Sequence, residues 1–390
     1  MNSHIHNLKG QVMSGSGFKP GVVSMQDGKI ISVEENVKPA AEDIIDVGQL
    51  FIVPGFIDLH IHGVHHDLVD HGIGALQKIS KNLLQYGVTG FLPTVYPRPA
   101  GEDTAFLKQI ATIHPEGAQI LGFHLEGPFL KLTGSLSQNA ISKKGDQQRA
   151  RSLIDACRPY KAVFSISPDV DGIADIIPIM AENDTAVFMT HTAANVEQTL
   201  AAIAAGASHA THFYDVFPCP EVTEPGVRPC GIVEAVLADK NVSVDFILDG
   251  VHVDPIAVKM AMACKENGSG KVCLITDANV GAGLEPGKFS FGETGDIYFE
   301  YKGAPARAVE GNFLAGSGLT MNTAVKNAVN FLGIPLHEAV TMASYNPATV
   351  LHIENGKGLI ETGYDADLLV VDKDVNIHQA WVAGELKYKI

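Results

Sequence analysis

Residues 54–63 read Pro-Gly-Phe-Ile-Asp-Leu-His-Ile-His-Gly, an apolar run that leads into two histidines separated by one residue. Successive side chains of a strand point to opposite faces, so His60 and His62 point to the same side and can reach one point. In a parallel barrel, the side chains that do chemistry stand at the carboxyl ends of the strands. We therefore interpret the pair as the end of a first barrel strand, predicted over 51–58.

Strand and helix patterns alternate along the middle of the chain. Strands are predicted over 51–58, 90–95, 119–126, 162–166, 186–191, 209–215, 242–249 and 272–277. Helices are predicted over 73–85, 146–157, 196–205, 255–265, 321–331 and 336–344. Eight strands with interleaved helices favour an α/β fold of the (β/α)8 TIM-barrel type over an open doubly wound sheet.

Both ends of the chain are rich in strand signals. Near the start, Asp27-Gly28 separates two apolar runs, which is typical of a β-hairpin. Near the end, residues 366–372 are strand-like and residues 381–386 suggest another hairpin. We predict a small β-sandwich domain from residues 1–52 and 358–390, and a barrel from residues 53–357. A long stretch near 279–313 interrupts the alternation and is expected to form a lid-like insertion at the active face.

Composition narrows the class of protein. The 390 residues are 46% hydrophobic and 18% charged, with a formal net charge of −16. This balance argues for a large core and against a nucleic-acid or anionic-membrane surface. Five cysteines form no CxxC pair, no signal peptide is recognisable, and no apolar run approaches the about 18 residues of a membrane helix. We expect a cytoplasmic enzyme with no nucleic-acid or membrane partner.

Further imidazoles and carboxylates stand where other predicted strands end. They are His124, Glu126, His191, His212 and Asp277. Taken singly, a strand-end histidine is more often an ordinary packed residue, and Asp277 could be a helix N-cap. Their recurrence at one end of several strands, together with the HxH pair, predicts a divalent-metal site, because zinc and iron(II) take such ligands.

The same set resembles the amidohydrolase superfamily and, more narrowly, the N-acetylglucosamine-6-phosphate deacetylase family. The segments that carry the resemblance are PGFIDLHIHG (54–63), HLEGPF (124–129), THF (211–213), DGVHV (249–253), TDA (276–278), LAGS (314–317) and GYDADL (363–368). The resemblance covers almost the whole chain, and its most specific part is the HLEGP segment.

The resemblance implies roles for individual residues. Glu126, His191 and His212 match the principal metal site, and Asp277 matches the catalytic acid/base. His60 and His62 match members that keep a second metal site, so one or two ions are implied. Matching positions for substrate contacts are His252, Gln138 and a closing loop that includes Leu314 and Ala315.

This chain departs from the family pattern at three positions, two of which concern phosphate binding. Gln138 stands where the family has a histidine that polarises the acetyl carbonyl. Asp215 replaces one of an Asn-Ala pair that binds phosphate, and Thr223 replaces an arginine that reaches phosphate across a dimer interface. Arg228 is a substitute candidate for that arginine. Two like unit charges 4 Å apart, such as a carboxylate and a phosphate, have a repulsion energy of about 1 kcal/mol in water and about 4 kcal/mol at an effective dielectric of 20.

We therefore expect a homodimeric, metal-dependent hydrolase of the acetamide of a small N-acetyl amino sugar, with zinc or iron as the metal. A deacetylase of an unphosphorylated or different N-acyl substrate remains an alternative. Deaminases and cyclic amidases of the superfamily commonly carry a His-x-x-Glu motif or a strand-four lysine, which residues 250–254 and 162–166 lack. A metal-free scaffold barrel is the alternative outside enzymes.

Overall fold

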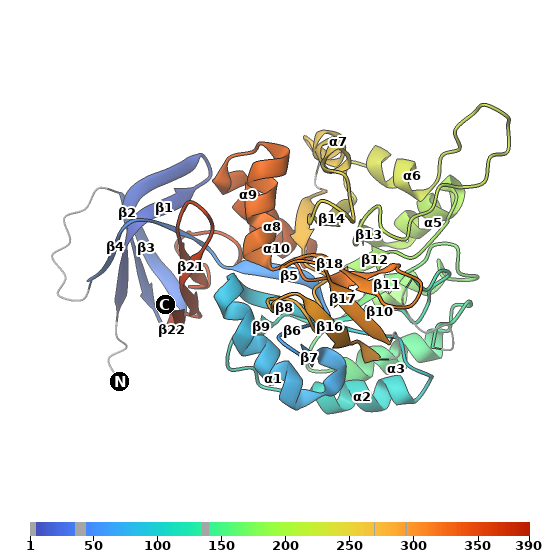
Figure 1. The fold of residues 1–390 in the computed structure, drawn as a ribbon, viewed down its shortest axis with the longest axis horizontal. Coiled ribbons are helices and arrows are strands. Elements are labelled where there is room, and N and C mark those ends of the chain that lie inside the picture. The colour runs from blue at the N-terminus through green and yellow to red at the C-terminus, as the bar shows by residue number, and fades with distance from the viewer. Residues whose placement is uncertain (1–4, 36–43, 135–139, 269, 293–294) are drawn as a thin grey trace.

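The computed structural model describes residues 5–35, 44–134, 140–268, 270–292 and 295–390. Figure 1 shows a barrel surrounded by helices, with a separate sheet at one side that holds both ends of the chain. The predicted TIM-type fold with a β domain from both termini is confirmed.

Eight parallel strands form the barrel in sequence order. They are β5 (Phe56–Ile61), β8 (Val88–Val95), β10 (Phe123–Glu126), β11 (Ala162–Ile166), β12 (Val187–Met189), β13 (Ala207–Ala210), β14 (Ser243–Ile247) and β15 (Val272–Ile275); short β9 (Gln119–Ile120) also pairs with β8. The seam closes where the backbone N–H of Asp277 donates to the carbonyl of His60 at 2.9 Å. The side chain of Asp58 on β5 accepts from the Thr276 hydroxyl at 2.6 Å across the same seam.

Three predicted strands differ from the structure by a division or by more than two residues, and one of them, 119–126, is divided between β9 and β10. The run 51–58 is divided at Gly55 between β4 (Ile44–Pro54) of the terminal sheet and β5 of the barrel. A Cβ at Gly55 would meet Oγ1 of Thr89 at 2.0 Å, so only glycine fits this crossing. The sixth strand ends at Ala210 rather than at Asp215, and the following residues form a turn.

Each barrel strand is followed by a helix. These are α1 (Ile73–Asn82), α2 (Glu102–Ile110), α3 (Gln147–Cys157), α4 (Ile177–Met180), α5 (Val196–Ala205), α6 (Ile232–Ala238), α7 (Pro255–Lys265) and α8 (Met321–Asn327), and then come α9 (Leu336–Ala343) and α10 (Tyr345–Val350). Side-chain caps explain three starts: Asp146 accepts from the N–H of Arg149, Asn195 from that of Gln198, and Asp254 from that of Ile256. A π-helical stretch, η4 (Ala328–Leu332), extends α8.

The terminal sheet has seven strands in the order β22-β21-β20-β4-β1-β2-β3. Besides β4 these are β1 (His6–Ser14), β2 (Gly17–Gln26), β3 (Lys29–Glu35), β20 (Leu368–Val371), β21 (Ile377–Val382) and β22 (Glu385–Lys389). Lys357 ties this sheet to the barrel, since Nζ lies 2.6 Å from Asp367 and 2.9 Å from Gln119 of β9.

The insertion between β15 and α8 is an antiparallel sheet of four strands. They are β16 (Gly287–Ser290), β17 (Asp296–Phe299), β18 (Pro305–Ala308) and β19 (Leu314–Ser317). A small apolar cluster that includes Phe291, Ile297 and Phe299 packs beneath it. Backbone bonds from Ser317 N–H to the Asp277 carbonyl and from Asn279 N–H to the Ser317 carbonyl fix the sheet to the end of β15. The insertion is thus joined to the strand end that carries Asp277.

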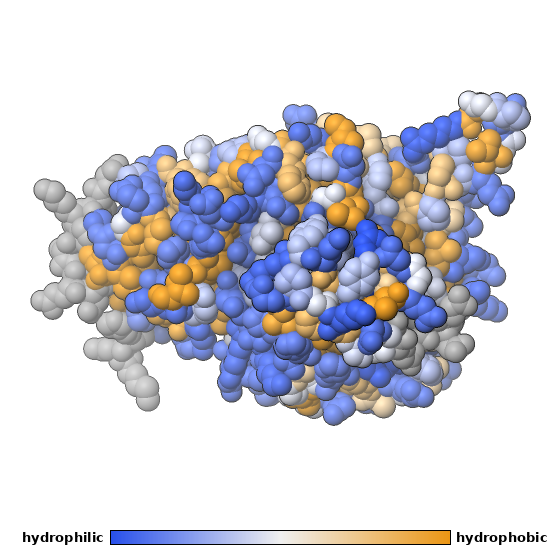
Figure 2. Space-filling model, viewed as in Figure 1, coloured by the Kyte–Doolittle hydropathy of each residue, from blue (hydrophilic) through white to orange (hydrophobic). Residues whose placement is uncertain are grey.

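One loop on the surface exposes hydrophobic side chains. The loop between β13 and α6 projects from the barrel (Figure 1) and carries hydrophobic residues towards its tip (Figure 2); Val222 and Val227 are 65% and 57% exposed. The cysteines form no disulfide. Among the helices of the described residues, none has the length and apolar character needed to span a bilayer.

Candidate active site

Six polar residues meet at the carboxyl ends of the barrel strands. This cluster consists of His60, His62, Glu126, His191, His212 and Asp277, and every member is buried. A cavity of about 370 Å³ opens onto it, and all members except His60 line the cavity wall. The residues predicted from strand ends are therefore brought together in space; the ring of His124 lies beside that of His60, with the centroids 4.5 Å apart, but it does not line the cavity. That ring instead bonds the carbonyl of Leu59 and the hydroxyl of Ser165.

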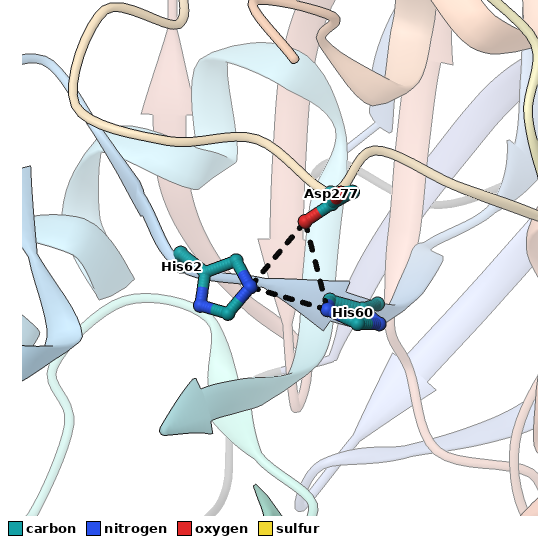
Figure 3. Close-up of side chains that lie close together, drawn as sticks. All are labelled: His60, His62 and Asp277. Carbon is teal, nitrogen blue, oxygen red and sulfur yellow. Dashed lines mark hydrogen bonds and ion pairs between the residues drawn. The ribbon is translucent and has the colours of Figure 1, made fainter. Parts of the chain in front are cut away.

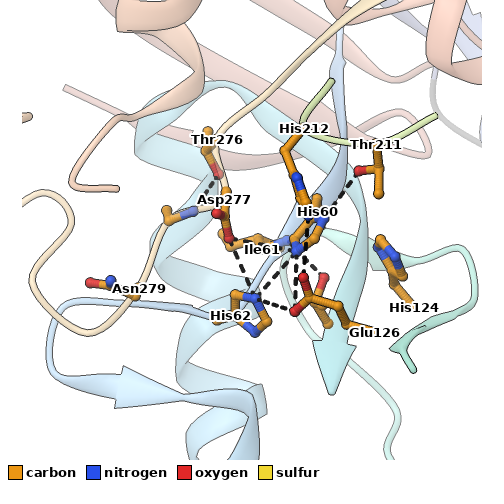
Figure 4. A network of polar contacts seen from close by, with 12 residues as sticks. His60, Ile61, His62, His124, Glu126, Thr211, His212, Thr276, Asp277 and Asn279 are labelled. Carbon is orange, nitrogen blue, oxygen red and sulfur yellow. Dashed lines mark hydrogen bonds and ion pairs between the residues drawn. The ribbon is translucent and has the colours of Figure 1, made fainter. Parts of the chain in front are cut away.

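Glu126 lies between two pairs of histidines. Its Oε1 is 3.0 Å from Nε2 of His191 and 3.3 Å from Nε2 of His212. Its Oε2 is 3.3 Å from Nε2 of His62 and 3.8 Å from Nε2 of His60. Figure 4 shows the carboxylate beside His60, His62 and His212. Because each oxygen faces a different pair, this carboxylate can bridge two neighbouring cations.

Asp277 faces the HxH pair from the other side of the barrel seam (Figure 3). Its Oδ1 is 3.4 Å from Nε2 of His62 and 3.5 Å from Nε2 of His60, and the two imidazole nitrogens are 3.2 Å apart. Although Oδ1 is buried, it has no hydrogen-bond partner among the described residues. A carboxylate oxygen and two ring nitrogens thus converge without satisfying one another fully.

The cluster fits a divalent metal. Ligand atoms of His60, His62 and Asp277, and likewise those of His60, Glu126 and His212, lie within 4.8 Å of one another. Imidazole and carboxylate donors in buried sets of three are the ligands of catalytic zinc sites, and a cation would satisfy the unpaired Oδ1 of Asp277. The donor set therefore supports a divalent cation at the end of β5.

Burial and charge oppose each other in the cluster. Burial disfavours ionisation of Glu126, yet the surrounding histidines outweigh it and hold the pKa of its carboxyl well below the usual range. Burial likewise works against charged His62 and His212, but Glu126 outweighs it and raises both pKa values, that of His212 to about 10. Protonated imidazoles therefore balance the carboxylate, and a divalent cation binding here would replace those protons.

Residues behind the cluster orient its rings, and the sequence analysis did not single them out. Oγ1 of Thr211 lies 3.1 Å from Nδ1 of His60. Buried Asp245 on β14 accepts from the backbone N–H of His212 at 2.5 Å and from the ring of His209 at 2.7 Å. Such partners fix the orientation of ligating histidines. Their signal in the sequence is weak, because a polar residue inside a barrel strand has many packing roles.

His252 follows β14 and carries a free nitrogen. Its Nδ1 lies 2.7 Å from Oδ2 of Asp249, whereas its Nε2 is buried with no partner in the described part of the chain. Burial would lower the pKa of His252, but Asp249, with Asp215 and Asp277 further away, outweighs burial and raises it. The ring is thus held by Asp249 and keeps Nε2 available.

The other residues predicted to contact substrate have different places in the structure. Asp215 and Leu314 line the cavity, while Ala315 is buried and its carbonyl accepts from Nδ2 of Asn279 at 2.7 Å. Arg228 was predicted to contact substrate, but within this chain it does not reach the cavity. It stands on the projecting loop with a 77% exposed side chain bonded to Glu234, and Thr223 on the same loop is also exposed. Gln138 lies outside the described residues.

Tyr96 is a cavity residue that the sequence analysis missed. It follows β8 directly and stacks on the ring of His62, with the centroids 4.0 Å apart and the planes inclined by 2°. The strand-end rule that selected the other residues would have found it at the end of the second strand.

Comparison with known proteins identifies the class. The chain belongs to the amidohydrolase family, whose model matches residues 51–387. Within that family it belongs with the N-acetylglucosamine-6-phosphate deacetylases. It is 31% identical to the enzyme of that name from Vibrio furnissii, with 99% of this chain and 96% of that protein covered. It is 30% identical to an N-acetylgalactosamine-6-phosphate deacetylase from Escherichia coli O157:H7, with 92% and 93% covered.

Solved structures of N-acetylglucosamine-6-phosphate deacetylases have the same fold as this chain. A mutant N-acetyl-D-glucosamine-6-phosphate deacetylase from Mycobacterium smegmatis, in complex with N-acetyl-D-glucosamine-6-phosphate, superposes with a TM-score of 0.88 at 27% identity, covering 99% of this chain and 100% of that one. The deacetylase from Pasteurella multocida gives 0.86 at 26% identity, covering 98% and 99%.

Proposed function

We propose that this protein hydrolyses the acetamide of an N-acetyl amino sugar to acetate and the free amine, with a divalent metal held by the cluster. The observation that carries the proposal is Glu126, whose two oxygens face two histidine pairs at the mouth of an amidohydrolase barrel. The names of the full-length relatives support the substrate class, since they are deacetylases of amino-sugar phosphates.

Glu126, His191 and His212 would hold the principal ion, and His60 and His62 with Asp277 would face a second position. A bound divalent metal lowers the pKa of water and polarises a carbonyl. The chain's own contribution is the carboxylate of Asp277, which takes the proton of the attacking water as its oxygen bonds to the acetyl carbon. The same proton then passes to the sugar nitrogen as the C–N bond breaks, so that the amine leaves neutral.

Zinc or iron(II) suits this ligand set best, because imidazole binds both well and the buried carboxylates complete it. The two faces of Glu126 support occupancy by one or two ions. Elemental analysis of the purified protein distinguishes these cases, and would also distinguish a metal-free scaffold.

The charged residues of the cavity wall favour a second candidate, an unphosphorylated N-acetyl compound. Among the described residues, no lysine or arginine lines the cavity, whereas the half-buried carboxylate of Asp215 does. A carboxylate accepts hydrogen bonds from a hydroxyl or an amine but repels a phosphate. Free Nε2 of His252 can serve a hydroxyl as well as a phosphate.

A screen of N-acetyl hexosamines, each with and without a 6-phosphate, tests both candidates through acetate release. The proposed reaction predicts acetate from at least one sugar and loss of activity with a chelator. A preference of a hundredfold for the 6-phosphate would refute the second candidate, and absence of acetate with every sugar would refute the proposed function.

A further inference from the structure

Tyr96 lies between the metal cluster and the insertion. One face of its ring stacks on His62, and its edge meets Phe291 of the insertion at a centroid distance of 5.6 Å and an angle of 80°. Phe291 is 2% exposed within the apolar cluster beneath the four-stranded sheet, and Tyr96 packs against that cluster. Contacts from both sides therefore fix the ring, so its position does not depend on a bound substrate.

The hydroxyl of Tyr96 can act on a ligand. Tyr96 lines the cavity, and its side chain is only partly buried, so a ligand in the cavity can reach it. A tyrosine phenol has an ordinary pKa of about 10 and is protonated at neutral pH, so it can donate a hydrogen bond while carrying no charge that would compete with a metal.

We infer that Tyr96 donates a hydrogen bond to the carbonyl oxygen of the scissile amide as that oxygen gains negative charge. The inference rests on the proposed amide hydrolysis. When the oxygen of water bonds to the acetyl carbon, the π electrons of the carbonyl move to its oxygen, and Tyr96 stabilises this oxyanion without giving up its proton. A donor that is held in place before the reaction stabilises the transition state more than the bound substrate.

The variant Tyr96→Phe tests this role, because it removes the hydroxyl and keeps the ring that stacks on His62. Steady-state acetate release from the sugar that the parent cleaves best should show kcat lower by about a hundredfold with KM changed less than about threefold, as expected for one oxyanion donor. Metal content by elemental analysis should equal that of the parent.

Calorimetry supplies a readout independent of turnover. A methylphosphonamidate of the amino sugar resembles the tetrahedral intermediate, whereas the deacetylated amine does not. We expect Tyr96→Phe to bind the phosphonamidate about a hundredfold more weakly than the parent and the amine equally well. The matched control is Tyr298→Phe, since the Tyr298 hydroxyl bonds Asn312 on the exposed side of the insertion. This control should retain parent activity.

Three outcomes would overturn the inference. The first is a Tyr96→Phe enzyme with kcat within threefold of the parent. The second is an equal loss of affinity for phosphonamidate and amine, which would make Tyr96 a ground-state contact. The third is loss of metal, which would make its role the support of His62. An inactive parent would refute the proposed function together with the inference, whereas an active parent with a fully active variant would refute the inference alone.

Discussion

Replacing Asp277 by asparagine should remove the proton acceptor of the site while leaving its shape. The backbone around Asp277 is fixed on both sides, because its N–H donates to the His60 carbonyl at 2.9 Å and its carbonyl accepts from Ser317 at 2.8 Å. Asparagine has nearly the same size as aspartate, and the Oδ1 atom that it keeps would still lie beside Nε2 of His60 and of His62, 3.5 and 3.4 Å away in the parent. The variant thus changes charge and basicity rather than packing.

The expected loss follows from the role of a general base. Positioned bases contribute about 10²–10⁴ in rate, which corresponds to about 3–5 kcal/mol of transition-state stabilisation. We expect kcat for acetate release to fall by this factor in Asp277→Asn, with at least one metal equivalent retained on Glu126, His191 and His212. The assay is steady-state acetate release combined with elemental analysis of the same preparation.

Asp296→Asn, an identical change at an exposed position of the insertion, is the matched control and should keep parent kcat. Turnover of Asp277→Asn within tenfold of the parent would refute the assignment of the base. Complete loss of metal would instead show that Asp277 is needed chiefly as a ligand.

Three further changes have distinct outcomes. Replacing both His60 and His62 by asparagine should lower bound metal towards one equivalent in a folded protein, and unchanged stoichiometry would contradict a second position. Asp215→Asn should raise the ratio of kcat/KM for 6-phosphorylated over unphosphorylated substrate about tenfold, because one like charge is removed. An unchanged ratio would contradict the proposed closeness of Asp215 to the 6-position of the substrate. Lys357→Met should lower the free energy of unfolding by about 2 kcal/mol in denaturant titrations, less than for a fully buried pair. The decrease in the free energy of unfolding caused by Lys357→Met should be constant between pH 5 and 9. A decrease that varies across this range would refute the assignment of Lys357 to an ion pair.

The pH window for Lys357 follows from its partners. Burial would lower the pKa of Lys357, but Asp367 and Asp365 outweigh burial and raise it. Its contribution to stability is fully present below the unfolded-state value of about 10.4 and is lost as pH rises through the folded-state value. Asp365 has a lowered pKa, so its contribution is present above about 3.9 and is lost at lower pH.

Sequence patterns predicted the barrel well where local signals and tertiary structure agree. Helices 196–205 and 255–265 have their predicted bounds, since Asn195 and Asp254 cap them and Pro255 favours a helix start. The boundary at Gly55 was missed because β4 and β5 are both buried near the crossing, so the apolar run continues across it. Only the close approach of Thr89 explains the glycine, and such a contact is not visible in a single sequence.

The site was predictable in its ligands but not in its supporting residues. Imidazoles and carboxylates at strand ends are rare enough to be noticed, which is why His60, Glu126 and Asp277 could be named. Asp245 looks like an ordinary core position until the fold places it beneath His212, whereas Tyr96 stands at a strand end, where the rule applied to the other residues would have found it. Arg228, the substitute candidate for the family's arginine, stands on an exposed loop and pairs with Glu234, so its contact with substrate stays a prediction.

Three members of the cluster have backbones that a sequence pattern does not predict. His191, His212 and Asp277 have φ values of 50°, 35° and 46°, in the left-handed region that costs a non-glycine residue about 1–3 kcal/mol. Each stands two residues after its strand, where the chain must turn sharply, and each is held by a bond from elsewhere: Leu132 N–H to the His191 carbonyl, Asp245 to the His212 N–H, and the His60 carbonyl to the Asp277 N–H. The strain is therefore sustained by the closed barrel and its loops. The same closure that brings the ligands together also holds them in conformations they would not adopt alone, so the cluster depends on the complete barrel.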